Sequence, residues 1–169
     1  MIYPIVKYGA AVLEQKTAPV TEFDDRLRQL VADMFESMYA AGGVGLAAPQ
    51  IGILKQLAVI DITSGEDPAA KLVLANPAIL SVEGKQKQEE GCLSLPGHHA
   101  EVVRPQRVSI RAQDATGRSY TRTGEDLLAR AFCHEIDHLH GKLFIAHLSV
   151  LKRNLTRRKI KKLMRAGEW

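Results

Sequence analysis

The side chains best suited to chemistry lie in the segment His134-Glu135-Ile136-Asp137-His138. On a helix, His134 and His138 lie one turn apart on the same face, so both imidazoles can bind a single metal ion. Glu135 follows the first histidine and can reach a water molecule bound to that metal. The spacing predicts a hydrolytic metal site, and the alternative is a helix whose histidines are only packed or solvated.

A catalytic site of this kind needs a third protein ligand and leaves one further position for water. His140 points to another side of the helix, and Asp137 lies on the wrong face to bind the same metal as the two histidines. Asp137 could still act through hydrogen bonds that orient the metal ligands. His147 and Cys92 remain as candidates. Cys92 would complete a set of one thiolate and two imidazoles, which suits a soft divalent metal, unless it is an ordinary packed cysteine.

Three motifs in the chain resemble, in order, those of the peptide deformylase family. They are Gly43-Val44-Gly45-Leu46-Ala47-Ala48-Pro49-Gln50, Glu90-Gly91-Cys92-Leu93-Ser94 and His134-Glu135-Ile136-Asp137-His138. The resemblance covers nearly the whole chain. It implies an enzyme that removes the formyl group from N-formylmethionine on nascent proteins. One small departure is Cys133, where many members carry Gln, which places a second thiol near the expected site.

For the metal, the resemblance implies that Cys92, His134 and His138 hold one divalent ion per chain. Fe(II) is the expected native ion, and zinc, nickel or cobalt can substitute for it. Two other functions would use some of the same residues: a general metallopeptidase in which Cys92 is only packed, and a non-enzymatic RNA-binding domain with a structural metal. Replacing Cys92 should abolish metal binding only in a deformylase, whereas a closed structural site has no need of Glu135.

For the reaction, the resemblance makes Glu135 the general base, which takes a proton from water and delivers it to the leaving amine. It assigns the contacts to the developing oxyanion to the side-chain amide of Gln50 and the backbone N–H of Leu93. The products are formate and a free N-terminal methionine. Taken alone, Gln50 would more simply be a turn residue after Pro49.

A pocket for the methionine side chain is expected on the helix that carries the histidines. Leu127, Arg130 and Ala131 precede His134 by seven, four and three positions, so they share its face. We expect them to line an apolar pocket. Arg130 would contribute its aliphatic stem and keep its guanidinium in water.

The glycine-rich loop and the cysteine motif supply the other expected walls of that pocket. Val44 can form a wall, and Gly43 and Gly45 lack side chains that would keep a substrate away from the backbone, although glycines also simply form turns. Glu90 could be a plain surface charge. The family resemblance makes it a residue of the site wall.

The elements that must position these residues follow from hydrophobic spacing and breaker residues. A helix of about 17 residues follows Thr21-Glu22-Phe23-Asp24, which resembles a capping box, and stops at Gly42. Short strands are predicted at residues 56–61, 71–74, 78–82, 100–103, 108–113 and 119–123. Helical spacing returns from residue 125 to Gly141, and a basic helix is predicted at about residues 149–165.

This order of elements predicts the fold class. Strands without helices between them favour antiparallel or mixed pairing over a doubly wound parallel sheet. We therefore expect an α+β fold with the strands packed around a central metal-binding helix and with N-terminal and C-terminal helices. A length of 169 residues predicts one catalytic domain over residues 1–169.

Composition argues against a membrane-spanning or secreted protein. The longest charge-free apolar runs are far shorter than the ~18 residues that a membrane-crossing helix needs. The N-terminal residues lack the basic start and apolar stretch of a signal peptide. Two cysteines, Cys92 and Cys133, are too few for a disulfide framework. We therefore expect a cytoplasmic protein.

Charge is distributed unevenly along the chain. The net charge is +4, but eight basic residues and no acidic ones lie between Lys152 and Arg165, which leaves 15 basic and 19 acidic residues elsewhere. A solvated helix face is the plain explanation of such a cluster. Because a deformylase meets its N-formylmethionyl substrates as they leave the ribosome, we expect this helix to contact ribosomal RNA. No membrane or DNA partner is expected.

Overall fold

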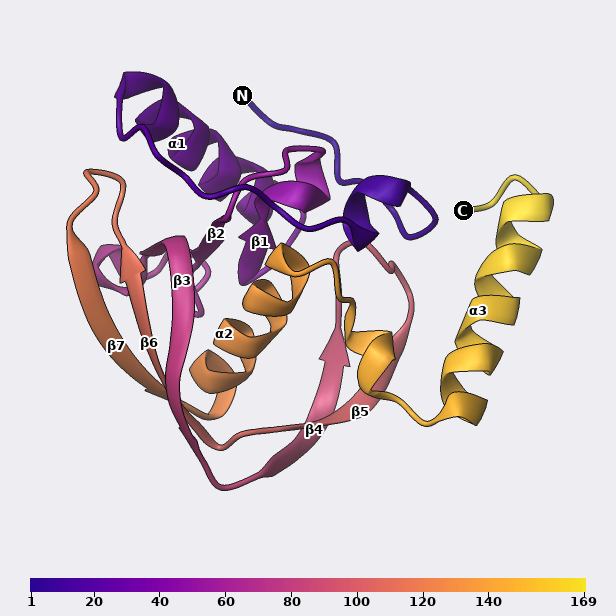
Figure 1. Cartoon of the computed structure of the whole chain (residues 1–169). Coiled ribbons are helices and arrows are strands. Elements are labelled where there is room, and N and C mark those ends of the chain that lie inside the picture. The colour runs from indigo at the N-terminus through magenta and orange to yellow at the C-terminus, as the bar shows by residue number, and fades with distance from the viewer.

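The computed structural model describes residues 1–169 and consists of two antiparallel sheets and three α-helices (Figure 1). The helices are α1 (Asp25–Ala40), α2 (Asp126–Leu139) and α3 (Val150–Arg165). A five-stranded sheet has the order β1 (Gly45–Ala47), β2 (Leu57–Ile60), β3 (Leu72–Glu83), β6 (Arg107–Gln113) and β7 (Ser119–Glu125). The second sheet pairs β4 (Gln86–Gly91) with β5 (His99–Arg104). The predicted α+β class is confirmed.

Helix α2 lies between the two sheets, as Figure 1 shows. Its Phe132 and Ile136 pack in one buried cluster with residues of the five-stranded sheet, among them Val108 and Ile110 on β6. Alternate residues of β6 are buried, as expected for a strand with one face on the core. Because both faces of α2 are covered, side chains on it are held rigidly and can position a site.

Helix α1 begins one turn later than a capping box at Thr21 would place it. Asp24 is the N-cap, and its side chain accepts a hydrogen bond from the backbone N–H of Leu27 at 3.0 Å. The acidic residue expected to close the box is therefore itself the cap, since a carboxylate accepts well from the free N–H groups of a first turn. The helix ends as predicted, with Gly42 in the left-handed region at φ +73°.

Strand β3 joins two predicted strands, residues 71–74 and 78–82, into one. Asn76 lies between them at φ +50° and interrupts the pairing with β6 between Ala75 and Ala78. Its side-chain amide donates to the carbonyl of Val20 at 2.9 Å and to Oε1 of Gln113 at 2.7 Å. The asparagine that reads as a strand breaker thus forms a bulge within a continuous strand.

Two strands were not predicted from the sequence, namely β1 and β4. Strand β1 has three residues, too few to show a period. Strand β4 has the sequence Gln-Lys-Gln-Glu-Glu-Gly, which lacks the apolar alternation of a typical strand. Both missed strands border the functional site.

Helix α3 lies at the outer edge of the molecule (Figure 1). Only Ile160 of this helix is fully buried, and most of its charged side chains face solvent. No helix in the chain combines the length and the apolar character that crossing a lipid bilayer requires.

Candidate functional site

The ligand atoms of Cys92, His134 and His138 converge, all lying within 4.8 Å of one another. Sγ of Cys92 lies 3.4 Å from Nε2 of His138, which lies 3.2 Å from Nε2 of His134. His147 is not part of this group, because its Nε2 lies 2.7 Å from Oδ2 of Asp137. Of the two candidates for a third ligand, the structure therefore places Cys92 with the histidine pair.

The three donors come from two elements that meet at the centre of the fold. Helix α2 carries both histidines one turn apart, and Cys92 directly follows the end of β4. The backbone N–H of Ser94 lies 3.4 Å from Sγ of Cys92, and the side-chain amide of Gln50 lies 3.5 Å from it. Both contacts hold the sulfur in place beside the histidines, and sulfur is a strong ligand for soft divalent metals.

The donor set fits a divalent metal ion. Burial lowers the pKa of both imidazoles, but hydrogen bonds with Cys92 and Glu90 hold the pKa of His134 well above its ordinary value. Burial and the neighbouring charge of His134 hold the pKa of His138 well below it. One sulfur and two imidazole nitrogens converge here from two elements, and a divalent ion can bind between them.

The buried carboxylate of Glu90 orients His134 through a hydrogen bond from the ring nitrogen Nδ1. Oε2 of Glu90 accepts from Nδ1 of His134 at 2.7 Å and from Nη2 of Arg104 at 2.7 Å. Burial alone would raise the pKa of Glu90, but these hydrogen bonds hold it well below its usual range. Because the carboxylate is ionised, Nδ1 carries the proton and the lone pair of Nε2 faces the other ligands.

Arg130 completes the surroundings of this carboxylate, and its guanidinium is not in water as expected. The residue is 5% exposed, and its Nη1 donates to Oε1 of Glu90 at 2.6 Å. Its Nη2 donates to the backbone carbonyl of Val102 at 2.9 Å. The guanidinium is drawn inward because a buried carboxylate requires charged donors.

Arg104, which the sequence did not mark, is the second guanidinium beside Glu90. It is 4% exposed, and its Nη1 also donates to Oδ2 of Asp137 at 2.8 Å. Asp137 in turn contacts His147 at 2.7 Å. Asp137 was predicted to act on the metal ligands through hydrogen bonds. The contacts are consistent with this, since they run from Asp137 through Arg104 and Glu90 to His134.

Glu135 lies beside the three donors and has unusual surroundings. It is 3% exposed, and its buried Oε2 has no hydrogen-bond partner. Burial, with a contribution from the charge of Glu90, raises the pKa of Glu135 to about 7. Gly45 faces this side chain so closely that a Cβ there would lie 2.9 Å from its Cδ. A carboxyl group with a pKa near neutrality can both accept and release a proton.

Gln50 and Leu93 present hydrogen-bond donors on the opposite side of the donor cluster. Gln50 belongs to a short 3₁₀-helix, Ala48–Ile51, in which its Oε1 accepts from the backbone N–H of Ala47 at 3.0 Å. That bond fixes the amide so that its Nε2 points toward Ser94 Oγ and Cys92. The backbone N–H of Leu93 makes no hydrogen bond within the chain. The N–H of Leu93 is free to serve a ligand, and the amide of Gln50 can do so by exchanging one of its long contacts, at 3.2 Å and 3.5 Å, for the ligand.

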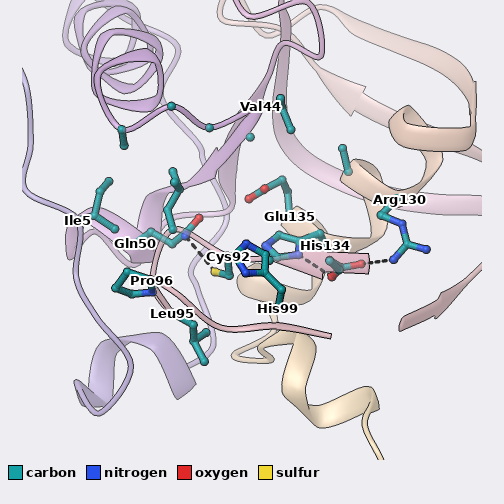
Figure 2. Close-up of a pocket in the computed structure, with 18 of the residues that line it drawn as sticks. Ile5, Val44, Gln50, Cys92, Leu95, Pro96, His99, Arg130, His134 and Glu135 are labelled. Carbon is teal, nitrogen blue, oxygen red and sulfur yellow. Dashed lines mark hydrogen bonds and ion pairs between the residues drawn. The ribbon is translucent and has the colours of Figure 1, made fainter. Parts of the chain in front are cut away.

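A cavity of about 490 Å³ opens beside these groups (Figure 2). The cavity is lined by every residue expected at the site except His138, which is 1% exposed. The lining residues are Gly43, Val44, Gly45, Gln50, Glu90, Cys92, Leu93, Leu127, Arg130, Ala131, His134 and Glu135. Leu127 is 46% exposed, at the rim.

Sequence reasoning missed several other lining residues, including Ile5, Leu95, Pro96 and His99. They come from the N-terminal segment and from the chain that follows Cys92. No spacing relates these segments to α2, so the sequence carried no signal for them.

The chain is similar to peptide deformylases over its whole length. Residues 2–154 match a family model described as polypeptide deformylase. A peptide deformylase from Acidobacterium capsulatum is 59% identical over 169 residues, covering 100% of this chain and 99% of the relative.

Solved structures of peptide deformylases are similar in fold as well. The structure from Legionella pneumophila has a TM-score of 0.92 and 46% identity, covering 99% of this chain and 98% of that one. The structure from Thermus thermophilus has a TM-score of 0.90 and 42% identity, covering 98% and 97% of the two chains.

Proposed function

Since the chain belongs to the polypeptide deformylase family, we propose that Glu135 moves the protons of its reaction. The protein is a metal-dependent hydrolase that removes the formyl group from the N-terminal methionine of nascent proteins and releases formate. The observation that carries the assignment is the buried, unpartnered Oε2 of Glu135 beside the donor cluster. This carboxylate would accept a proton from the attacking water and deliver it to the leaving amine.

Cys92, His134 and His138 would hold the metal. When bound there, a divalent ion supplies Lewis acidity toward the attacking water and the formyl carbonyl. We propose Fe(II) as the native ion, with zinc, nickel and cobalt as substitutes, because a mixed set of thiolate and imidazole donors accepts all four.

Gln50 and Leu93 would stabilise the negative charge that develops on the formyl oxygen. The amide of Gln50 is held in place by its bond to Ala47, so it would donate after exchanging a contact with Ser94 or Cys92 for the substrate oxygen. The free N–H of Leu93 would supply a second donor. The two donors and Glu135 border the same cavity, which allows all three to reach one substrate.

The peptide part of the substrate would bind in extended form. Strands β1 and β4 are each an edge of their sheet, and residues of both line the cavity. An extended peptide can pair with such edges through its backbone, which does not depend on its sequence. The methionine side chain would lie against Val44, Leu127 and Ala131.

The assignment is tested by formate release from a formyl-methionyl tripeptide, using protein loaded with Fe(II) without oxygen. Glu135→Gln should retain the metal, measured by elemental analysis, and lose turnover. Turnover that survives in this variant would refute the role of Glu135. Cleavage of an unformylated peptide by the wild type would instead support a general metallopeptidase, and loss of metal in Cys92→Ala would argue against that alternative.

We further propose that the protein works in the cytoplasm and meets its substrates at the ribosome through α3. Supporting this, cationic side chains of the helix such as Arg158, Lys161 and Lys162 are exposed. Clustered cations bind RNA phosphates with an affinity that falls steeply with salt. Changing these three residues to Glu should abolish co-sedimentation with ribosomes at low salt, while formyl-peptide turnover stays unchanged. Co-sedimentation that survives the change would refute the contact.

A further inference from the structure

A second, smaller hollow lies at the base of α3, away from the deformylase site. It has a volume of about 150 Å³, and none of its lining residues lines the larger cavity. Its walls come from the N-terminal segment, from the turn after α2, from the short helix Phe144–His147 and from α3. Its size suits a small ion, since pockets for larger organic ligands measure about 300–1,000 Å³.

The charge around this hollow is mainly positive and unpaired. Lys142, Arg153 and Arg157 line it, and the only acidic lining residue is Glu14. None of the three cations forms an ion pair with any carboxylate of the chain, Glu14 included. By contrast, the two arginines beside Glu90 each form an ion pair with it, although the Nε of Arg130 also lacks a hydrogen-bond partner.

Arg153 has the least satisfied side chain of the group. The residue is half-buried, and its Nε is buried without any hydrogen-bond partner. A buried donor without an acceptor is unfavourable, so an acceptor that enters the hollow would gain from pairing with it. Arg153 and Arg157 lie one turn apart on α3, and like charges at this spacing repel each other unless an anion lies between them.

The position of Arg153 on its helix makes its unpaired positive charge more unfavourable. It lies in the first turn of α3, which contains no acidic residue. The N-terminus of a helix carries partial positive charge and favours anions, so a cation there is unfavourable by itself. An anion bound beside Arg153 would therefore relieve repulsion from the neighbouring cations and from the helix.

We propose that this hollow binds a phosphate group, with Lys142, Arg153 and Arg157 as its cationic contacts. Arginine suits this ligand because its planar donors match phosphate oxygens in pairs. Leu143 and Ile145 add apolar lining, and the volume of about 150 Å³ suits a single group. The group is either free inorganic phosphate or a phosphate of an RNA backbone. The site uses none of the proposed deformylase residues, and it does not use Arg158, Lys161 or Lys162 of α3.

Calorimetric titration of the metal-loaded full chain with inorganic phosphate, at constant ionic strength, tests the site. We expect saturable binding of one phosphate, weakened at least tenfold by Arg153→Gln and by Arg157→Gln. Arg158→Gln is the matched control, since this neighbouring arginine does not line the hollow, and it should bind as the wild type does. The two hollow variants should also retain formyl-peptide turnover.

A second titration, with a short RNA that lacks terminal phosphates, identifies the source of the group. RNA binding that Arg153→Gln weakens and that Arg122→Gln, at an exposed position of β7, leaves unchanged assigns the site to RNA. Phosphate binding without RNA competition assigns it to the free ion. The proposal is wrong if no saturable binding exceeds that of chloride. It is also wrong if both hollow variants bind phosphate like the wild type, because the anion would then lie elsewhere, as at the active-site metal.

Discussion

Replacing Glu90 with Gln should destabilise the fold more than any other single change at the site. The carboxylate is the partner of two buried guanidinium groups and of His134. In the variant, Arg130 keeps only the carbonyl of Val102, and the new amide presents donors to groups that are themselves donors. The loss of one partner in a buried ion pair costs about 3–5 kcal/mol of unfolding free energy.

That cost can be translated into measurable shifts. For a chain of this length, about 2–4 °C of Tm corresponds to each kcal/mol, so the variant should melt roughly 6–20 °C below the wild type. His134 also loses the acceptor that fixes its tautomer, so metal affinity should fall about 10–100-fold. The two effects have a common cause in the structure, but they are measured independently.

Thermal melts of the metal-free protein and chelator competition on the loaded protein provide these measurements. Glu89→Gln is the matched control, because this neighbour on β4 is exposed and has no ion pair. The control should change neither quantity. If Glu90→Gln melted within 1–2 °C of the wild type and kept its metal affinity, the buried network would not orient His134, and the reasoning would fail.

Three further changes have specific outcomes. Gly45→Ala should lower kcat on the order of 100-fold, because the added Cβ displaces the Glu135 carboxylate. Its Tm should change little, because the backbone at Gly45 is unstrained. Normal turnover would contradict this prediction. Burial and the hydrogen bond to Asp61 raise the pKa of Tyr39 to about 12, so the wild type should lose stability as pH rises from 10 to 12. Tyr39→Phe, about 1 kcal/mol less stable at pH 8, should show a smaller loss in denaturant titrations, and the rest comes from Tyr120, whose pKa burial also raises to about 12. Leu127→Arg should lower kcat/KM for formyl-methionyl peptides at least tenfold while metal binding persists, and unchanged turnover would show that this wall does not contact methionine.

Local periodicity accounts for the parts of the fold that could be predicted. The buried residues of α1, such as Val31 and Met38, recur at helical spacing because one face of the helix covers the core. Strand β6 was predicted for the corresponding reason, since its alternate residues face α2. Strand β4 was missed because it pairs only with β5 and exposes most of its side chains, so no burial pattern marks it.

The predicted ligand pair likewise rests on local geometry. His134 and His138 are close in space because a helix brings positions four apart together, whatever the rest of the chain does. Cys92 lies 42 positions before the first of them, and its inclusion depended on a likeness to a known family. In the structure, the end of β4 lies beside α2 and brings Cys92 next to the two histidines.

The burial of Arg130 could not be derived from the sequence for a related reason. On α2 alone, an arginine on the pocket-facing side would extend its charge to water, as long cationic side chains do at surfaces. It turns inward because β4 brings a carboxylate, Glu90, into the core to orient a metal ligand. One buried carboxylate with four hydrogen bonds requires charged donors, so the orientation of His134 determines the conformation of an arginine one turn away. The same argument predicts that other arginines of the chain remain in solvent unless an anion, from the protein or from a ligand, is placed beside them.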